Sequence, residues 1–224
     1  KGWNDRNHTC ALFQQIFPSL ALTEYPEMQA LALLVRQYLQ GFAPVTENDI
    51  AWWVGLGKKK IREVLDNIHE EITYIEISAL KNEFIQLKED LPSLEAIKTS
   101  VEPTISLLPT LDPYLMGYKD RERYLHSSYY ERVFDRTGNV TSTILLNGQI
   151  IGIWDFTEDP DPLVKLFFFE DVEESSLLEI RREASRIGKF ICEKEVQLVE
   201  CEAMVPLKHR TAGGFLTPLK DCKA

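Results

Sequence analysis

The side chains best suited to chemistry are basic residues grouped at the start of one short segment. Lys58, Lys59 and Lys60 are consecutive, and Arg62 follows after Ile61. Clustered lysine and arginine side chains neutralise the phosphates of a nucleic-acid backbone. The sequence therefore predicts phosphate contacts at Lys58, Lys59, Lys60 and Arg62. A solvated helix face without a ligand is the alternative.

A second basic group lies between positions 119 and 136. Four acidic residues interleave with its five basic ones, so the net charge of the group is only 5 − 4 = +1. Ion pairs within the domain are therefore the alternative use of these cations. Asn147-Gly148 predicts a tight hairpin, which is either a plain turn or a loop presented to a DNA groove. Besides Lys119, the predicted nucleic-acid contacts here are Arg121, Arg123, Arg132, Arg136 and Asn147.

The cysteine and histidine residues do not have the spacing of a metal site. The four cysteines are far apart without a Cys-x-x-Cys pair, and the four histidines are scattered singly. We therefore expect no metal, no cofactor, and reduced thiols in a cytoplasmic protein. The chain also lacks a secretory signal pattern and an apolar run long enough to span a bilayer, so we expect no membrane contact.

The chain as a whole is acidic, with 224 residues, a net charge of −10 and a pI near 5.0. This charge excludes a uniformly basic nucleic-acid binder but allows a local basic face. With 44% hydrophobic residues the composition is that of an ordinary globular protein, and the length allows one large domain or two of ordinary size.

Two short helices around a glycine turn must position the first basic group. Thr46 and Asp49 have the spacing of a capping box, with Asp in place of the usual Glu or Gln, and Gly55-Leu56-Gly57 ends that helix. The next helix begins near Lys58 and carries its apolar residues on one face. Those residues are Ile61, Val64, Leu65 and Ile68.

The flanking segments extend this pattern to a winged helix-turn-helix. A helix is expected from Pro26 to Gly41, and two strands at 72–78 and 83–88 read as a wing. We therefore predict a winged helix-turn-helix domain over residues 26–101. Any small helical subdomain is the alternative. Residues 1–25 are expected to be the remnant of an upstream winged-helix domain.

The C-terminal half predicts a small antiparallel sheet covered by one helix. Strands are expected around the Asn147-Gly148 turn, at 163–169 and at 196–203. Ser176 and Glu179 have the spacing of a capping box for the long helix between the last two strands. The predicted fold class is α+β, with residues 102–224 as the second domain. Trp52, Trp53 and Trp154 are expected in the core, and platforms that stack on bases are the alternative.

The segment from Ser106 to Trp154 resembles the winged-helix DNA glycosylases of the AlkZ type. The matching signatures are Leu107-Leu-Pro-x-Leu-Asp-Pro-Tyr-Leu-Met-Gly117, Asp120-Arg-Glu-Arg123, Arg136-x-Gly-Asn139 and Leu145-Leu-Asn-Gly-Gln-Ile-Ile-Gly-Ile-Trp154. The stretch from Tyr38 to Trp53 is similar to the second winged helix of that family. The resemblance implies tandem winged helices with a β-rich part, a channel for duplex DNA, and excision of alkylated or crosslinked bases. Within the signature, Asp112, Tyr114 and Tyr118 either anchor their loop or contact substrate.

The catalytic motif of that family, Gln-x-Gln or Gln-x-Asp in the first winged helix, has no counterpart here. No Gln-x-Gln occurs in the sequence, so no catalytic residue is assigned and the catalytic segment is expected upstream of Lys1. We predict the DNA-binding portion of a winged-helix DNA glycosylase-like protein, which is an enzyme only at full length and has double-stranded DNA as its partner. The alternative is a non-catalytic winged-helix module that binds DNA or protein.

Overall fold

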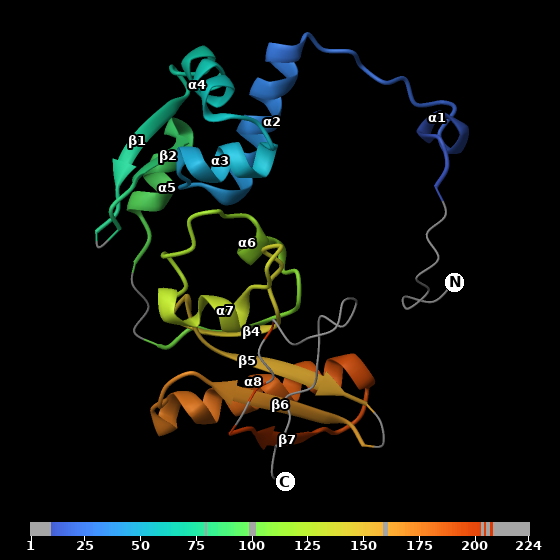
Figure 1. Cartoon of the computed structure of the whole chain (residues 1–224), viewed down its shortest axis with the longest axis vertical. Coiled ribbons are helices and arrows are strands. Elements are labelled where there is room, and N and C mark those ends of the chain that lie inside the picture. Colours follow the sequence, from blue (N-terminus) through green and yellow to red (C-terminus); the bar gives the residue numbers. More distant parts are fainter. Residues whose placement is uncertain are drawn as a thin grey trace.

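The computed structural model describes residues 10–78, 80–98, 102–158 and 161–202, together with Met204 and Leu207. Residues 1–9, where part of the predicted upstream remnant falls, lie outside this set. The first described element, α1 (Phe13–Ile16), stands apart from the rest of the chain (Figure 1), and residues 10–25 are all exposed. No helix among the described residues is both long and apolar enough to cross a membrane.

Three helices make up the first half of the fold. They are α2 (Glu27–Phe42), α3 (Glu47–Val54) and α4 (Lys58–Asn67). Thr46 caps α3 with the predicted capping box, since its side chain accepts from the Asp49 backbone N–H while Asp49 accepts from Thr46 N–H. Gly55 ends α3 in the left-handed region with φ of 75°, a conformation that glycine adopts without strain. The two predicted helices around a glycine turn are confirmed.

A β-hairpin and a short helix follow α4. Strands β1 (Ile72–Glu76) and β2 (Glu83–Leu87) pair antiparallel, with Ile72 opposite Leu87. The one-turn helix η1 (Lys88–Asp90) leads into α5 (Leu91–Glu95). Within β2, residues 84–87 are all buried, so both faces of this strand are covered. The strand pair predicted as a wing is thus present and is packed on both sides along β2.

The second half contains a five-stranded sheet with the order β3-β4-β5-β6-β7. Its strands are β3 (Ile105–Leu108), β4 (Thr143–Leu146), β5 (Gln149–Thr157), β6 (Leu163–Phe168) and β7 (Gln197–Glu200). The predicted hairpin turn between β4 and β5 is confirmed, with positive φ at both Asn147 and Gly148. Between β3 and β4 lie α6 (Pro113–Met116), η2 (Ser127–Tyr129) and α7 (Tyr130–Val133).

Three details of the second half differ from the prediction. Helix α8 (Glu174–Cys192) crosses back along the sheet, so β7 pairs parallel with β6 and the sheet is mixed instead of antiparallel. The helix begins at Glu174 with no side-chain cap, so the capping box predicted at Ser176 is wrong. Cys10 and Cys192 are free thiols, whereas Cys201 is disulfide-bonded, so reduced thiols were wrongly expected there.

The hydrophobic core crosses the predicted domain boundary at residue 101. One cluster contains Tyr38 and Ile50 of the helical half together with Leu115 and Tyr124 of the segment between β3 and β4. A second cluster lies between the sheet and α8, with Ile144, Leu166 and Ile180 among its buried members. Figure 1 shows α6 and α7 between the upper helices and the lower sheet. The boundaries at 25 and 101 stay predictions, and one of the two core clusters contains residues from both halves.

A buried carboxylate joins the two halves at this contact. Asp49 is fully buried, and its Oδ1 accepts from the backbone N–H groups of Lys119 and Asp120, each at 2.7 Å. Its Oδ2 accepts from Thr46 N–H at 2.9 Å and lies 3.6 Å from the Arg123 guanidinium. A charge removed from water is stabilised only when it is paired and hydrogen-bonded on all sides, as it is here.

The Asp49→Asn variant should therefore lose about 3 kcal/mol or more of unfolding free energy, because one carboxylate oxygen becomes a donor and Arg123 loses its buried countercharge. Urea unfolding followed by circular dichroism measures this change. The matched control is Asp66→Asn on the exposed face of α4, which should stay within about 0.5 kcal/mol of the unmodified chain. Equal stability of the two variants would contradict the role assigned to Asp49.

Candidate nucleic-acid interface

The four cations predicted on the helix after the glycine turn are not equally available. Lys60 lies 3.2 Å from Glu27 and 3.8 Å from Glu63. Arg62 donates to both carboxylate oxygens of Glu47 at 2.9 Å, which raises the pKa of its guanidinium. Lys58 and Lys59 are exposed and have no ion-pair partner among the described residues. Of the four predicted cations, Lys58 and Lys59 are therefore the two without an ion pair in the described part of the chain.

The N-terminus of α4 adds to the positive charge of Lys58 and Lys59. Gly57 occupies the N-cap position without a side-chain cap, and the first turn of α4 contains no acidic residue. The free backbone N–H groups and the helix dipole make such an end favourable for an anion. The apolar residues predicted for this helix, Ile61, Val64, Leu65 and Ile68, are buried, so Lys58 and Lys59 are held on a fixed surface.

Arg121 does not reach the surface, although it was predicted as a phosphate contact. It is 7% exposed, and its guanidinium lies 3.5 Å from the Phe134 ring centroid. It donates to Tyr118 O, to Tyr130 Oη and to Gly138 O. All three guanidinium nitrogens have acceptors, so this side chain fixes the 118–138 segment internally.

Arg123 is also used inside the protein. It donates to Pro44 O at 2.8 Å, lies beside the buried Asp49 carboxylate, and covers the Tyr118 ring at 4.0 Å. Neither guanidinium is presented to solvent, so these contacts lend no support to the prediction that Arg121 and Arg123 bind DNA. The alternative stated in the sequence analysis, an ion pair within the protein, fits Arg123, which lies 3.6 Å from the Asp49 carboxylate.

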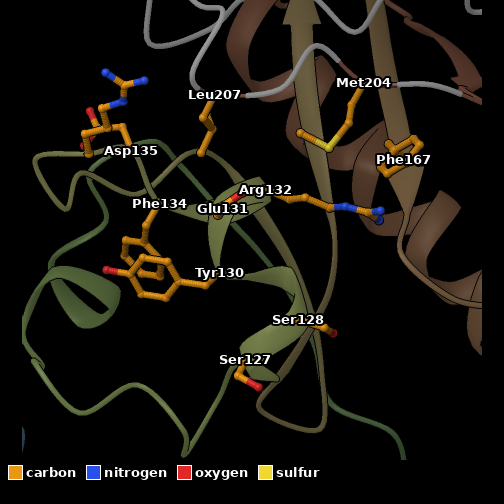
Figure 2. Close-up of a pocket in the computed structure, with 11 residues that line it drawn as sticks. Ser127, Ser128, Tyr130, Glu131, Arg132, Phe134, Asp135, Phe167, Met204 and Leu207 are labelled. Carbon is orange, nitrogen blue, oxygen red and sulfur yellow. The ribbon is translucent and has the colours of Figure 1, made fainter.

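The remaining predicted contacts are exposed. Arg132 and Arg136 both line a cavity beside α7, and Figure 2 shows Arg132 there. Lys119 is exposed, while its backbone N–H binds Asp49. Asn147 is exposed, but its side-chain oxygen accepts from Thr104 N–H and its φ of 51° suits the hairpin turn. The plain-turn alternative therefore accounts for Asn147.

The signature residues of the 107–118 segment serve as anchors. Asp112 caps α6 by accepting from the backbone N–H groups of Tyr114 and Leu115. The Tyr118 hydroxyl donates to Phe42 O, and the Tyr124 hydroxyl donates to Leu115 O. The Tyr38 hydroxyl of the helical half donates to Gly117 O of the second half at 2.6 Å. Burial raises the pKa of Tyr118 to about 12 and also raises the pKa values of Tyr38 and Tyr124.

The tryptophan prediction is confirmed for one residue of three. Trp154 is buried, and its indole N–H donates to Leu108 O. Trp52 and Trp53 are 37% and 38% exposed, so the expected core position is wrong for both. They lie at the last turn of α3, where the helix leaves the shared core. Trp53 stacks on Tyr38, and Trp52 lies 6.0 Å from the Arg121 guanidinium.

The described residues contain no group of three or more His, Cys, Asp or Glu placed to hold a metal ion.

The residue that sequence reasoning missed is Asp49, whose spacing indicated only a helix cap. Its contacts with Lys119 and Asp120 join positions about seventy residues apart. A capping pattern is local and gives no sign of such a partner.

Comparisons with known proteins agree with this architecture. The family model described as "DNA glycosylase AlkZ-like" matches residues 1–190 and confirms the resemblance of the signature segment. The solved DNA glycosylase AlkZ of Streptomyces sahachiroi is similar, with a TM-score of 0.63 and 20% sequence identity. The alignment covers 79% of this chain and 48% of that one, so this chain spans about half the length of that relative. At this identity the likeness shows a shared fold. The curated proteins gave no match.

The buried tyrosines predict a loss of stability at alkaline pH. An unfolded tyrosine has a pKa of about 10, whereas the folded values are raised, so the folded state holds its phenolic protons more tightly. Their contribution to stability is complete below pH ~10 and is lost as the pH rises above it. Absorbance at 295 nm should therefore rise together with the loss of the circular dichroism signal at 222 nm. Full tyrosine ionisation with an unchanged dichroism signal would contradict this.

Proposed function

Because this chain belongs to the AlkZ-like DNA glycosylase family, we propose that it forms the duplex-DNA-holding portion of a winged-helix DNA glycosylase. The observation that carries the proposal is the N-terminus of α4, where Lys58 and Lys59 are exposed, form no ion pair with any described residue, and lie beside backbone N–H groups that no side chain caps. Phosphate contacts of this kind position a protein on duplex DNA without reading its sequence.

The elements around α4 support a winged-helix assignment for the first half. Helices α2, α3 and α4 are followed directly by the antiparallel β1–β2 hairpin. Helix α4 follows α3 across a glycine turn. It therefore has the position of the second helix of a helix-turn-helix, which is the recognition helix. The turn of the β1–β2 hairpin is tied down, since Asn82 donates to Asp120 at 3.4 Å. A wing held in this way would keep a fixed position relative to α4.

The chemistry proposed for the full-length protein is hydrolysis of the glycosidic bond of an alkylated or crosslinked base. A modified cationic base leaves easily, so the enzyme needs mainly to orient a water molecule at the sugar carbon. Since this chain contains no Gln-x-Gln motif, we assign its residues to DNA holding and none of them to catalysis. The cytoplasmic location likewise stays a prediction.

The second candidate is a winged-helix module that binds without catalysis. The lack of a Gln-x-Gln motif and the net charge of −10 favour it. The two candidates differ in their products: a glycosylase leaves an abasic site in DNA, whereas a binding module leaves the DNA intact.

Changing Lys58 and Lys59 together to Glu should abolish retention of duplex DNA, because two phosphate contacts become repulsive. Fluorescence anisotropy of a labelled duplex at low salt measures the effect, and the folded state is checked by circular dichroism. The matched control makes the same charge change at two exposed lysines that form no ion pair with a described residue, Lys98→Glu with Lys194→Glu. Unchanged affinity in the α4 variant, or an equal loss in the control, would remove α4 as the DNA-contacting element.

Incubation of the full-length protein with duplex DNA carrying a 7-alkylguanine should give abasic sites, detected as strand cleavage after alkali treatment. The Lys58→Glu, Lys59→Glu variant should react far more slowly at sub-saturating DNA, because it loses binding and keeps its chemistry. Tight binding of the damaged duplex with no abasic site formed would favour the non-catalytic module instead.

A further inference from the structure

Leu111 has a backbone conformation that an apolar residue seldom adopts. Its φ is 59°, in the left-handed region, where the Cβ of an L-residue crowds the following carbonyl oxygen. Glycine avoids this crowding, whereas a bulky side chain raises the energy of the folded state. The other described residues with positive φ are glycines or polar residues, namely Gly55, Gly138, Gly148, Asn147 and Glu193. Leu111 is therefore the apolar member of this set, and its conformation is strained.

The Leu111 side chain gains little from burial to offset this strain. It is 43% exposed, and it belongs to neither of the two hydrophobic core clusters. A large apolar side chain that is exposed as well as strained raises the free energy of the folded chain in two ways. Strained residues of this kind cluster at ligand-binding and active sites. The position of Leu111 thus indicates contact with a ligand.

Hydrogen bonds on both sides of Leu111 hold the strained conformation. The Leu111 N–H donates to Val140 O at 3.1 Å. On one side the Thr110 hydroxyl lies 3.3 Å from the Ser142 hydroxyl, and on the other side Asp112 caps α6. The loop between β3 and α6 is thus fixed at Leu111 and at both neighbouring residues. Because the backbone is already ordered, contact through this side chain loses little conformational entropy.

A stacked base step of duplex DNA is a suitable partner for a single rigid apolar side chain. Proteins that bend DNA insert Phe, Leu, Ile or Met between two base pairs, which unstacks the step and kinks the duplex. A stable protein interface, in contrast, buries about 800 Å² on each partner, far more than one leucine side chain offers. One exposed leucine on a fixed loop therefore favours DNA over a protein partner.

The charges beside Leu111 allow a polyanion to approach. The Asp112 carboxylate accepts from backbone N–H groups of α6, and the Asp135 carboxylate accepts from its own turn, which ends where Val140 pairs with the preceding strand residue. Arg136 of this turn is exposed and makes no ion pair with a described residue. Since both carboxylates are hydrogen-bonded to the protein, their repulsion of DNA is reduced.

We propose that Leu111 is a DNA wedge, a side chain that enters between two stacked base pairs of a duplex and unstacks them. The inference rests on the proposed function, because it requires a protein that holds duplex DNA. It adds a distortion of the duplex that phosphate contacts at Lys58 and Lys59 do not produce. An unstacked step opens more easily, which would bring a damaged base within reach of a glycosylase.

The fluorescence of 2-aminopurine, a base analogue that becomes brighter when it loses its stacked neighbours, tests the proposal. The analogue is placed in turn at each position of a short duplex. At saturating protein the fluorescence should rise about twofold or more at one or more positions. The Leu111→Ala variant should still bind the duplex through α4 but give no rise. The matched control is Leu178→Ala, which shortens an exposed leucine of α8 and should unstack the DNA as the unmodified protein does.

The Leu111→Gly variant separates a wedge from a packing residue. Glycine adopts a φ of 59° without strain, so the urea midpoint of unfolding should stay the same or rise, while the fluorescence increase is lost. A lowered midpoint together with a normal fluorescence increase would show that Leu111 serves packing, and would overturn the proposal.

The remaining outcomes separate the wedge from the duplex site. Duplex binding without a rise at any labelled position, or an equal rise with Leu111→Ala, overturns the wedge and leaves the proposed function standing. A partner other than DNA for Leu111 predicts this result. Absence of duplex binding overturns both. A rise that Leu111→Ala abolishes supports the wedge even if the Lys58→Glu, Lys59→Glu variant keeps full affinity, a result that would remove only α4 as the DNA-contacting element.

Discussion

The carboxylate of Asp49 supports both the local and the long-range structure of this protein. One oxygen completes the capping box of α3, and the other accepts two backbone N–H groups of the 119–120 segment. The neighbouring Asp120 extends the contact, because its side chain accepts from Thr46, Asn48 and Asn82. The start of α3, the hairpin turn and the signature segment are therefore held together by two adjacent hydrogen-bonded networks, and α4 and the cavity lining are positioned relative to this contact.

The basic residues of this acidic chain indicate where DNA could bind only after the cations that pair inside the protein are set aside. Arg62, Arg121 and Arg123 belong to the most basic stretches of the sequence, yet each is committed to acceptors of the protein itself. Among the described cations without an ion pair, Lys58 and Lys59 lie at a helix N-terminus, and Arg132 and Arg136 line a cavity. Under the proposed function, the lysine pair donates to the phosphates of the duplex backbone. Under that proposal, a net-negative chain has a local basic site for a polyanion at α4.

Local patterns predicted the fold more reliably than the site. The capping box at Thr46, the glycine turn, the hairpin at Asn147 and the family signature depend on neighbouring residues and are present as expected. The parallel pairing of β7, the exposure of Trp52 and the burial of Arg121 depend on packing between distant segments. A basic stretch shows how many cations there are, whereas tertiary contacts decide which of them find acceptors inside the protein. The structure is therefore needed to separate the internally bonded cations from the exposed ones.

The salt dependence of duplex binding tests this account most directly, because its slope counts the phosphate contacts. If Lys58 and Lys59 are the cations that reach the DNA backbone, the logarithm of the association constant should fall with the logarithm of salt concentration with a slope of about −2. Replacing the internally paired Arg62 with Gln should leave that slope unchanged. A slope of about −5 or steeper, or a clear reduction in the Arg62→Gln variant, would show that internally paired cations also bind DNA and would contradict the account.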